Sequence, residues 1–317
     1  MSPSPSASGL VAEAPRIGQW HELLWHAKLE RVVLVNGGPE TGGRAGDPLE
    51  LWAWDGQAWA RLAADPDGPA WRNFGTAAYD PARDVIVVQG GSVGATSPSD
   101  ETWEWDGAAW RLVTRTGPGA REGAGMDFDP VSRRMILFSG GVGGRVLADT
   151  WAFDGSTWSR LMDSGPRARF PAAFTATPDG LLLYGGHVLG DPNQISIGDT
   201  WLWDGETWTE AATFSAPGSR VNVGAAMDPR NGRLLLIGGG SSDDSLGDVW
   251  AWDGADWTEV DDDAFPARQG HRAAFDRRRN VVVVTGGLDR PGSTSPLQDV
   301  WEWSGSGPAT KVFDPAG

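Results

Sequence analysis

The chain has no cysteine, 2 tyrosines and 4 histidines among its 317 residues, and fewer basic than acidic residues. Without cysteine, disulfides, thiolate nucleophiles and cysteine-ligated zinc are excluded. Lys and Arg number 26 against 42 Asp and Glu, a formal net charge of -16, and nucleic-acid or anionic-membrane surfaces need clustered positive charge. No apolar run approaches the length of a transmembrane helix. We therefore expect neither a nucleic-acid nor a membrane partner.

Residues 1–16 lack the apolar core and the basic start of a secretory signal peptide. They are rich in Ser, Pro and Ala, and we expect a flexible or ring-closing segment on a soluble, cytoplasmic chain. No phosphate-binding glycine loop, dinucleotide fingerprint or nucleophile elbow occurs, so no cofactor is expected. The acidic turns at 65–68 and 242–244 are too short to predict a calcium site, and no metal is expected.

Tryptophan is abundant, and all but Trp20, Trp25 and Trp71 of the 19 tryptophans belong to one recurring motif. In 103–107 (Trp-Glu-Trp-Asp-Gly) the two indoles are two residues apart and share one face of an extended strand. The Asp-Gly pair predicts a tight type I′ turn, followed by a second strand. The motif starts six times, at intervals of 48 to 51 residues, at Trp52, Trp103, Trp151, Trp201, Trp250 and Trp301.

Two further predicted strands precede each motif. The nearer is an apolar run ending in paired glycines, as in 85–91, and the farther ends in an aromatic residue or Met, usually followed by Asp-Pro, as in 78–81. Four strands per unit, with paired glycines after the second and Trp in the fourth, resemble the kelch repeat of β-propellers. The resemblance covers roughly residues 17–313. It implies an all-β, six-bladed β-propeller of four-stranded antiparallel blades, with 17–317 as one domain.

The closure of the ring stays open at this point. A closed ring is expected because one blade cannot bury its wide aromatic faces alone. Either 10–13 or 310–313 could supply the outermost strand of blade 6. The first and last units also depart from the pattern: Trp25-His26 stands where later units have an aromatic residue and Asp, and Ser304-Gly305 replaces Asp-Gly.

The connections between second and third strands vary most, and variable loops commonly carry binding residues. They should emerge together with the connections between blades on one face, opposite the Asp-Gly turns. We call it the loop face and expect a concave binding site there. The six connections are 39–47, 92–100, 142–147, 187–198, which begins with the candidate ligand residue His187, 241–247 and 288–298.

A column of arginines is expected at the channel mouth on the loop face. Each stands eight residues before the apparent end of the first strand of its unit: Arg72, Arg121, Arg167, Arg220 and Arg268. The kelch resemblance implies an arginine at this place that in some members contacts acidic ligands, so one interpretation is an anion-binding ring. The other is structural, because an acidic residue lies two positions before every motif Trp, as at Glu101 and Asp149, and could pair with these arginines.

Where blade 6 meets blade 1, His21 and His271 occupy equivalent positions and are followed by Glu22 and Arg272. Neighbouring blades could bring these four together, and histidine titrates near neutral pH, so the cluster is a candidate for acid–base chemistry. The alternative is that both histidines are structural hydrogen-bonding residues. Trp20 and Trp71 lie outside the motif and could either stack against a ligand or cover the end of the aromatic core.

Two functions follow as hypotheses. The first is a binding module that holds a protein segment or a small polar, anionic or sugar-like ligand at the loop face and channel mouth. The alternative is a cofactor-independent enzyme of the epimerase, mutarotase, cyclase or lyase type. In that case His21, Glu22 or His271 would move a proton, and Arg72, Arg121 or Arg268 would hold an anionic group.

Overall fold

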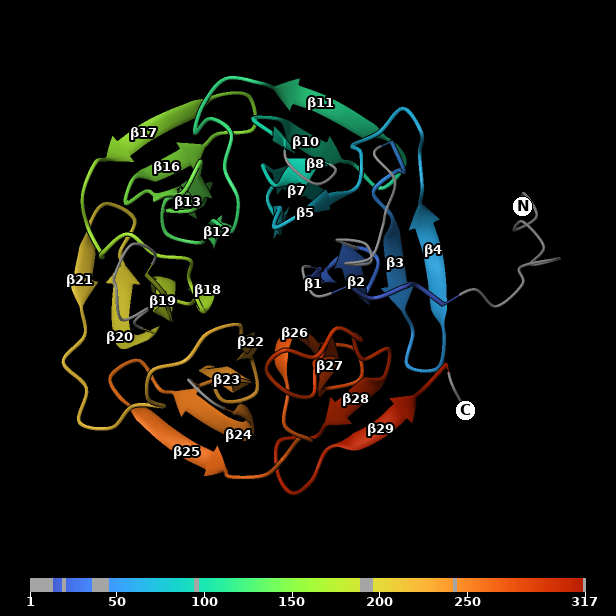
Figure 1. Ribbon diagram of the computed structural model, residues 1–317, viewed down its shortest axis with the longest axis vertical. Coiled ribbons are helices and arrows are strands. Elements are labelled where there is room, and N and C mark those ends of the chain that lie inside the picture. Colours follow the sequence, from blue (N-terminus) through green and yellow to red (C-terminus); the bar gives the residue numbers. More distant parts are fainter. Residues whose placement is uncertain are drawn as a thin grey trace, which may run out of the picture.

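The computed structural model describes residues 14–18, 21–35, 46–93, 97–188, 196–241 and 244–315. Their strands form six four-stranded antiparallel sheets, each from one continuous stretch of chain. Figure 1 shows these sheets as six blades around a central axis, with the first strand of each blade innermost. The expected six-bladed β-propeller is confirmed. Within these ranges, no helix could cross a membrane.

The strands follow the chain outward from the axis in every blade. Blades 1 to 3 contain β1 (Glu22–His26), β2 (Arg31–Val35), β3 (Leu51–Trp54), β4 (Trp59–Ala63); β6 (Thr76–Asp80), β7 (Val85–Gln89), β10 (Thr102–Trp105), β11 (Trp110–Thr114); β12 (Gly125–Asp129), β13 (Arg134–Phe138), β16 (Thr150–Phe153), β17 (Trp158–Met162). Blades 4 to 6 contain β18 (Ala173–Thr177), β19 (Gly180–His187), β20 (Ser196–Trp203), β21 (Trp208–Glu210); β22 (Gly224–Asp228), β23 (Arg233–Gly240), β24 (Ser245–Trp252), β25 (Trp257–Asp261); β26 (Gln269–Asp276), β27 (Val281–Leu288), β28 (Val300–Trp303), β29 (Thr310–Phe313). Short extra strands are β5 (Arg72–Asn73), β8 (Ser92–Val93), β9 (Ser97–Pro98), β14 (Gly141–Val142) and β15 (Arg145–Val146).

The outer hairpin forms in each blade, with Asp-Gly in blades 1 to 5 and Ser-Gly in blade 6, but its Asp-Gly turn is not type I′. In blade 2 the strands pair up to Trp105 and Trp110, so four residues form the loop. Gly107 has a φ of 94°, whereas Asp106 is not among the residues with positive φ. The Asp106 carboxylate accepts hydrogen bonds from the backbone N–H groups of Ala108 and Ala109, both at 2.9 Å. Asp therefore acts as a side-chain cap of a longer turn, and only the glycine supplies the left-handed conformation.

The core of the molecule lies between the blades. Each of six buried apolar clusters combines residues of two neighbouring blades, including blades 6 and 1. Tryptophans of the outer hairpins also bond across the boundary: the indole N–H of Trp158 donates to Thr102 Oγ1 at 2.9 Å, and that of Trp208 to Thr150 Oγ1 at 3.0 Å. Because every cluster needs two blades, no blade is stable on its own.

Among the described residues, all four strands of blade 6 come from the C-terminal part of the chain and all four strands of blade 1 from the N-terminal part. The outermost strand of blade 6 is β29, one of the two expected possibilities, and 10–13 lies outside the described residues. The segment 14–18 lies at the boundary of blades 6 and 1. There the Ile17 N–H donates to Gln298 Oε1 at 2.9 Å, and the Gln298 amide donates to the Ile17 carbonyl at 2.8 Å. Ile17, 2% exposed, belongs to the apolar cluster of this boundary.

Candidate functional site

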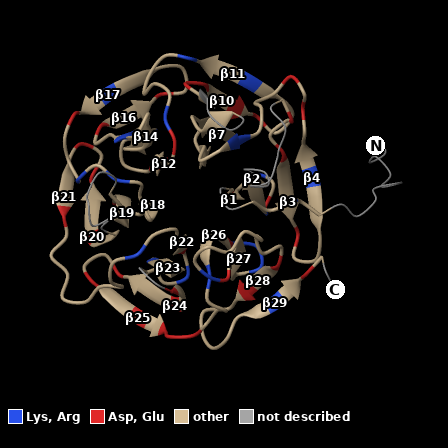
Figure 2. Ribbon diagram, viewed as in Figure 1, with Lys and Arg blue, Asp and Glu red and all other residues tan. Residues whose placement is uncertain are grey.

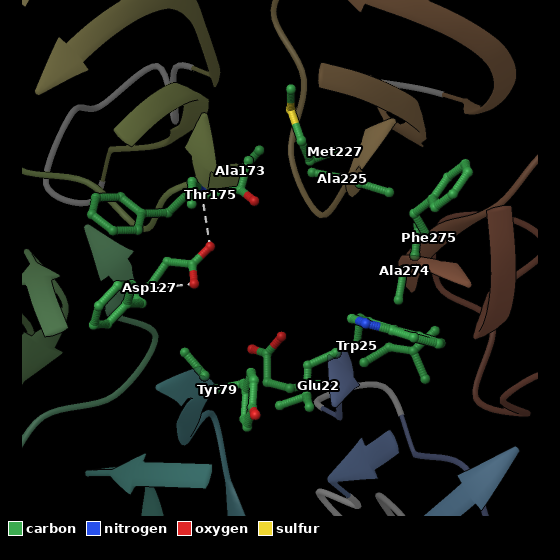
Figure 3. Close-up of a pocket in the computed structure, with 18 of the residues that line it drawn as sticks. Glu22, Trp25, Tyr79, Asp127, Ala173, Thr175, Ala225, Met227, Ala274 and Phe275 are labelled. Atoms are coloured by element: carbon green, nitrogen blue, oxygen red, sulfur yellow. Dashed lines mark hydrogen bonds between the residues drawn. The ribbon is translucent and has the colours of Figure 1, made fainter. Parts of the chain in front are cut away.

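The six inner strands enclose a channel along the axis of the propeller. Its cavity has a volume of about 670 Å³ and is lined by residues of β1, β6, β12, β18, β22 and β26. Small-molecule sites in proteins commonly have volumes of roughly 300–1,000 Å³. Most of the wall is alanine and larger apolar side chains, among them Trp25, Met227 and Phe275 (Figure 3). In Figure 2 most of the ribbon next to the axis is tan, the colour of residues other than Lys, Arg, Asp and Glu.

The inner strands end at equivalent residues, which allows the channel to be compared blade by blade. Two residues before that end, five blades carry an apolar residue or threonine, and blade 3 carries Asp127. The five are Leu24, Ala78, Thr175, Ala226 and Ala274. Nothing in the repeat requires an acidic residue at this place, so Asp127 is a particular feature of this chain.

The Asp127 carboxylate is held in a fixed orientation. Oδ1 accepts the N–H of Phe128 and Oδ2 accepts the N–H of Ala176 on the neighbouring β18, both at 2.8 Å. Burial raises the pKa of Asp127 to about 6, although these bonds lower it, and the charge of Glu22 adds to the increase. No Lys, Arg or His side chain in the described part of the chain forms an ion pair with Asp127. Figure 3 shows Asp127 and Glu22 pointing toward the middle of the channel.

Glu22 and Arg272 form an ion pair across the boundary of blades 1 and 6, with Arg272 Nε 3.0 Å from Glu22 Oε2. Both residues line the channel, and their side chains are 26% and 23% exposed. The guanidinium also donates to the His271 carbonyl at 3.1 Å. Two of the four residues expected to cluster at this boundary, Glu22 and Arg272, are thus in contact. They place one negative and one positive charge in the channel.

The arginine column lies inside the blades and not at a ligand surface. Five arginine side chains, 0–3% exposed, pair with the acidic residue that precedes the motif Trp of the same blade. The pairs are Arg72 with Glu101, Arg121 with Asp149, Arg169 with Asp199, Arg220 with Asp248 and Arg268 with Asp299. Each arginine also donates to the backbone carbonyl just beyond the buried second strand or near its end, as from Arg121 to Ser139 at 2.7 Å. These contacts fit the structural interpretation of the column.

Arg169, and not Arg167, occupies the column in blade 4. The expected register was wrong because it took Thr175 as the end of the first strand, whereas β18 ends at Thr177. Blade 4 lacks the Asp-Pro that marks this end in most other blades. Arg167 itself is exposed, and its backbone carbonyl accepts a bond from Arg169 Nε at 2.8 Å.

In blade 1 the position equivalent to the column arginines is Gly18. Its backbone carbonyl accepts a hydrogen bond from Nδ1 of the His21 ring at 2.8 Å.

His21 and His271 are completely buried and do not line the channel. Burial lowers the pKa of His21 to about 3 and that of His271 well below its usual value, with the nearby arginines acting in the same direction. Each ring packs against a glycine of the preceding blade, His21 against Gly286 and His271 against Gly238. Both therefore stay neutral at physiological pH and fill the space that these glycines leave.

Trp71 and His187 lie apart from the channel wall. Trp71 is 7% exposed, so its indole offers little surface to a ligand, and Trp20 lies outside the described residues. His187 is partly exposed at the end of β19, where its backbone exchanges two hydrogen bonds with Phe170. Within the described ranges, no three His, Asp or Glu side chains gather as they would around a metal ion.

The sequence matches no protein-family model and no curated protein. Asp127 is the residue that reasoning from the sequence missed. Its signal was visible, because Asp127 stands where the equivalent sequences, such as Ala78 before Tyr79-Asp80, are apolar. The sequence did not show that this position faces a cavity.

Proposed function

We propose that this chain is a kelch-type propeller that binds a small polar molecule in its central channel. The observation that carries the proposal is Asp127, a carboxylate in an otherwise largely apolar wall, with no acidic equivalent in the other five blades. Ligand cavities are typically apolar with a few oriented polar groups, and ionisable groups with shifted pKa values concentrate at such sites. The Glu22–Arg272 pair supplies further hydrogen-bonding groups near one mouth.

The geometry supports binding in the channel better than an arginine-rimmed anion site or acid–base catalysis by histidine. The column arginines are engaged with buried carboxylates and carbonyls, so a ligand in the channel does not reach them. His21 and His271 are fully buried, and their lowered pKa values remove the titration near neutral pH that the catalytic hypothesis needs.

A thermal-shift screen of sugars, organic acids and amines tests the proposal. A ligand at 100 times its Kd stabilises the folded chain by about 2.7 kcal/mol, which gives a clear rise in Tm. Asp127→Ala, and Thr175→Phe, which fills the channel beside it, should reduce the shift. Asp262→Asn, at an exposed position after β25, should leave it unchanged. Ligands that stabilise both channel variants as strongly as the wild type would place the binding site elsewhere.

A further inference from the structure

We infer that the ligand of the channel is a small organic cation, a protonated amine, held by the carboxylate of Asp127. The inference rests on the proposed binding function and adds the chemical class of the ligand. It is supported by the balance of charge in the channel, by the orientation of the Asp127 carboxylate and by the residues around it.

The channel wall holds one carboxylate without a cationic partner. Glu22 and Arg272 compensate each other at 3.0 Å, whereas Asp127 is bonded only by neutral donors in the described part of the chain. A carboxylate in a poorly solvated site is costly unless a positive charge pairs with it. A bound ammonium group would supply that charge. An anionic ligand near Asp127 would instead meet two carboxylates and the already paired Arg272, because the other arginine of the lining, Arg277, lies at the far mouth.

The geometry of Asp127 fits an ammonium donor. A carboxylate offers about four acceptor positions, and the N–H groups of Phe128 and Ala176 occupy one on each oxygen. The Thr175 hydroxyl gives a third bond, and together these bonds fix the plane of the carboxylate, which points toward the middle of the channel (Figure 3). An ammonium group carries three N–H donors and can bond both oxygens of Asp127 together with the nearby hydroxyl of Thr175.

The walls suit the apolar part of such a molecule. The cavity is lined by Leu24, Ala274, Met227 and Phe275, apolar side chains that need no hydrogen-bond partner. Trp25 also lies on the wall (Figure 3), and an indole attracts a cation placed over its face. A net charge of -16 raises the local concentration of cations around the whole molecule. An amine with a short hydrocarbon body matches all three features.

The charged groups that face Asp127 come from several blades. β1 contributes Glu22 and β26 contributes Arg272, which largely cancel, and β6 contributes Tyr79, whose hydroxyl donates to Asp84 at 2.8 Å. β18 carries no titratable residue, and the only one on β22 is Asp228, which Arg230 pairs at 2.8 Å. At the far mouth the exposed Arg277 lines the cavity. Asp127 is therefore the group whose titration should control the binding of a cation.

The test compares molecules of one shape and three charges: benzylamine, benzyl alcohol and benzoate. Calorimetric titration at pH 7.5 should show binding of benzylamine by the wild type and by Asp262→Asn, and at least tenfold weaker binding by Asp127→Asn. For the wild type, affinity for benzylamine should fall about tenfold between pH 7.5 and pH 5, because protonation of Asp127 removes the charge while the amine stays protonated.

Equal or tighter binding of benzyl alcohol or benzoate would overturn the choice of a cation while leaving a binding channel in place. The choice would also be overturned if the affinity for benzylamine changed neither in Asp127→Asn nor with pH. Absence of binding by all three compounds would count against the inference, and the wider ligand screen would then decide separately whether the channel binds anything. A cooperative thermal unfolding transition of unliganded Asp127→Asn would show that the variant is folded.

Discussion

Arg121 shows what one side chain of the column does. Its guanidinium bonds both oxygens of Asp149 at 2.9 and 3.1 Å, and the same carboxylate accepts the indole N–H of Trp151 at 2.7 Å. Burial alone would raise the pKa of Asp149, but the bonds from Arg121 and Trp151 hold it below its usual value. One arginine thus satisfies a buried acid that in turn orients the first tryptophan of the motif.

Removing this arginine should be far more damaging than removing an exposed one. Arg121→Ala leaves Asp149, 5% exposed, with only the half-exposed Arg160 at 4.0 Å as a cationic partner, and breaking a buried pair costs about 3–5 kcal/mol. Arg167→Ala, at the exposed position that the sequence suggested for the column, should change the free energy of unfolding by less than about 0.5 kcal/mol. Urea unfolding of both variants measures the difference, and equal effects would contradict the structural role of the column.

Asp127 should make stability depend on pH in the opposite sense to most aspartates. Its pKa is raised from 3.8 to about 6 in the folded chain. Between these values the folded chain holds a proton that the unfolded chain has released. The contribution of Asp127 to the free energy of unfolding therefore falls as pH rises through this window, by up to about 3 kcal/mol.

Asp127→Asn removes that titration and provides the comparison. Urea unfolding at pH 4 and pH 7.5 should show the wild type losing stability relative to the variant at the higher pH, by about 1–3 kcal/mol. A difference between the two proteins that stays constant with pH would mean that Asp127 titrates as an ordinary exposed carboxyl group. In that case the cation inference would lose its electrostatic basis.

At the scale of the strand hairpin, the aspartate of the Asp-Gly turn acts as a cap. In blade 3, Asp154 Oδ1 accepts the N–H groups of Ser156 and Thr157, both at 2.8 Å, and these bonds hold the pKa of Asp154 below its usual range. Blade 6 has Ser304 at the equivalent place. A serine hydroxyl makes such turn bonds more weakly than a carboxylate. The capping role can therefore be tested by removing the carboxylate at Asp154 and by adding one at Ser304.

Asp154→Ala should lower the free energy of unfolding by about 1–2 kcal/mol, since both backbone donors lose their partner. Ser304→Asp should raise it by about 0.5–1 kcal/mol by adding the missing cap. Arg230 donates to the Ser304 carbonyl, so a new negative charge there would also meet a nearby cation. Both changes are measured by urea unfolding, and a loss of stability in Ser304→Asp would contradict the capping role.

At the scale of the whole molecule, the boundary between blades 6 and 1 is the place where the ring is joined only by contacts. The described part of this boundary includes the Glu22–Arg272 pair, the bond from Trp54 Nε1 to Glu302 Oε1 at 3.1 Å, and the reciprocal bonds of Ile17 with Gln298. Between residue 14 and residue 315, the part of the ends that the structure describes, no strand is exchanged across this boundary. The segment 14–18 therefore helps to hold blades 6 and 1 together through the bonds of Ile17 with Gln298.

Removing the bonds between Ile17 and Gln298 should make the ring open at this boundary first. Gln298→Ala removes both bonds to Ile17 and should cost about 1–3 kcal/mol. Native-state hydrogen exchange should accelerate at β1 and β26 more than at β12 and β18, which lie away from the boundary. An equal acceleration of all inner strands would show that the ring unfolds as one unit with no weaker boundary.

The sequence was most informative where the same physical requirement recurs six times. The motif tryptophans and the glycine turns that follow them predicted six blades correctly because each copy supports the register of the others. The predicted register of the arginine column was wrong at Arg167, because blade 4 lacks the Asp-Pro that marks the end of the first strand. The predicted turn type was wrong because a dipeptide alone does not reveal that Asp106 caps two backbone N–H groups.

The channel was harder to predict because it is made by single residues from separate blades. The sequence placed His21, Glu22, His271 and Arg272 near one another, but it could not distinguish side chains that point between blades from those that point to the axis. The histidines fill space beside glycines, and Glu22 and Arg272 meet in the channel. Asp127 could be recognised only once its blade was aligned with the other five in space.

The most direct test of the account is a crystal structure of the chain soaked with benzylamine at pH 7.5. We predict density for the amine inside the channel, with its nitrogen about 3 Å from a carboxylate oxygen of Asp127 and its ring against the apolar wall. Density only on the loop face or between blades, with the channel holding none, would contradict the assignment of the channel as the binding site.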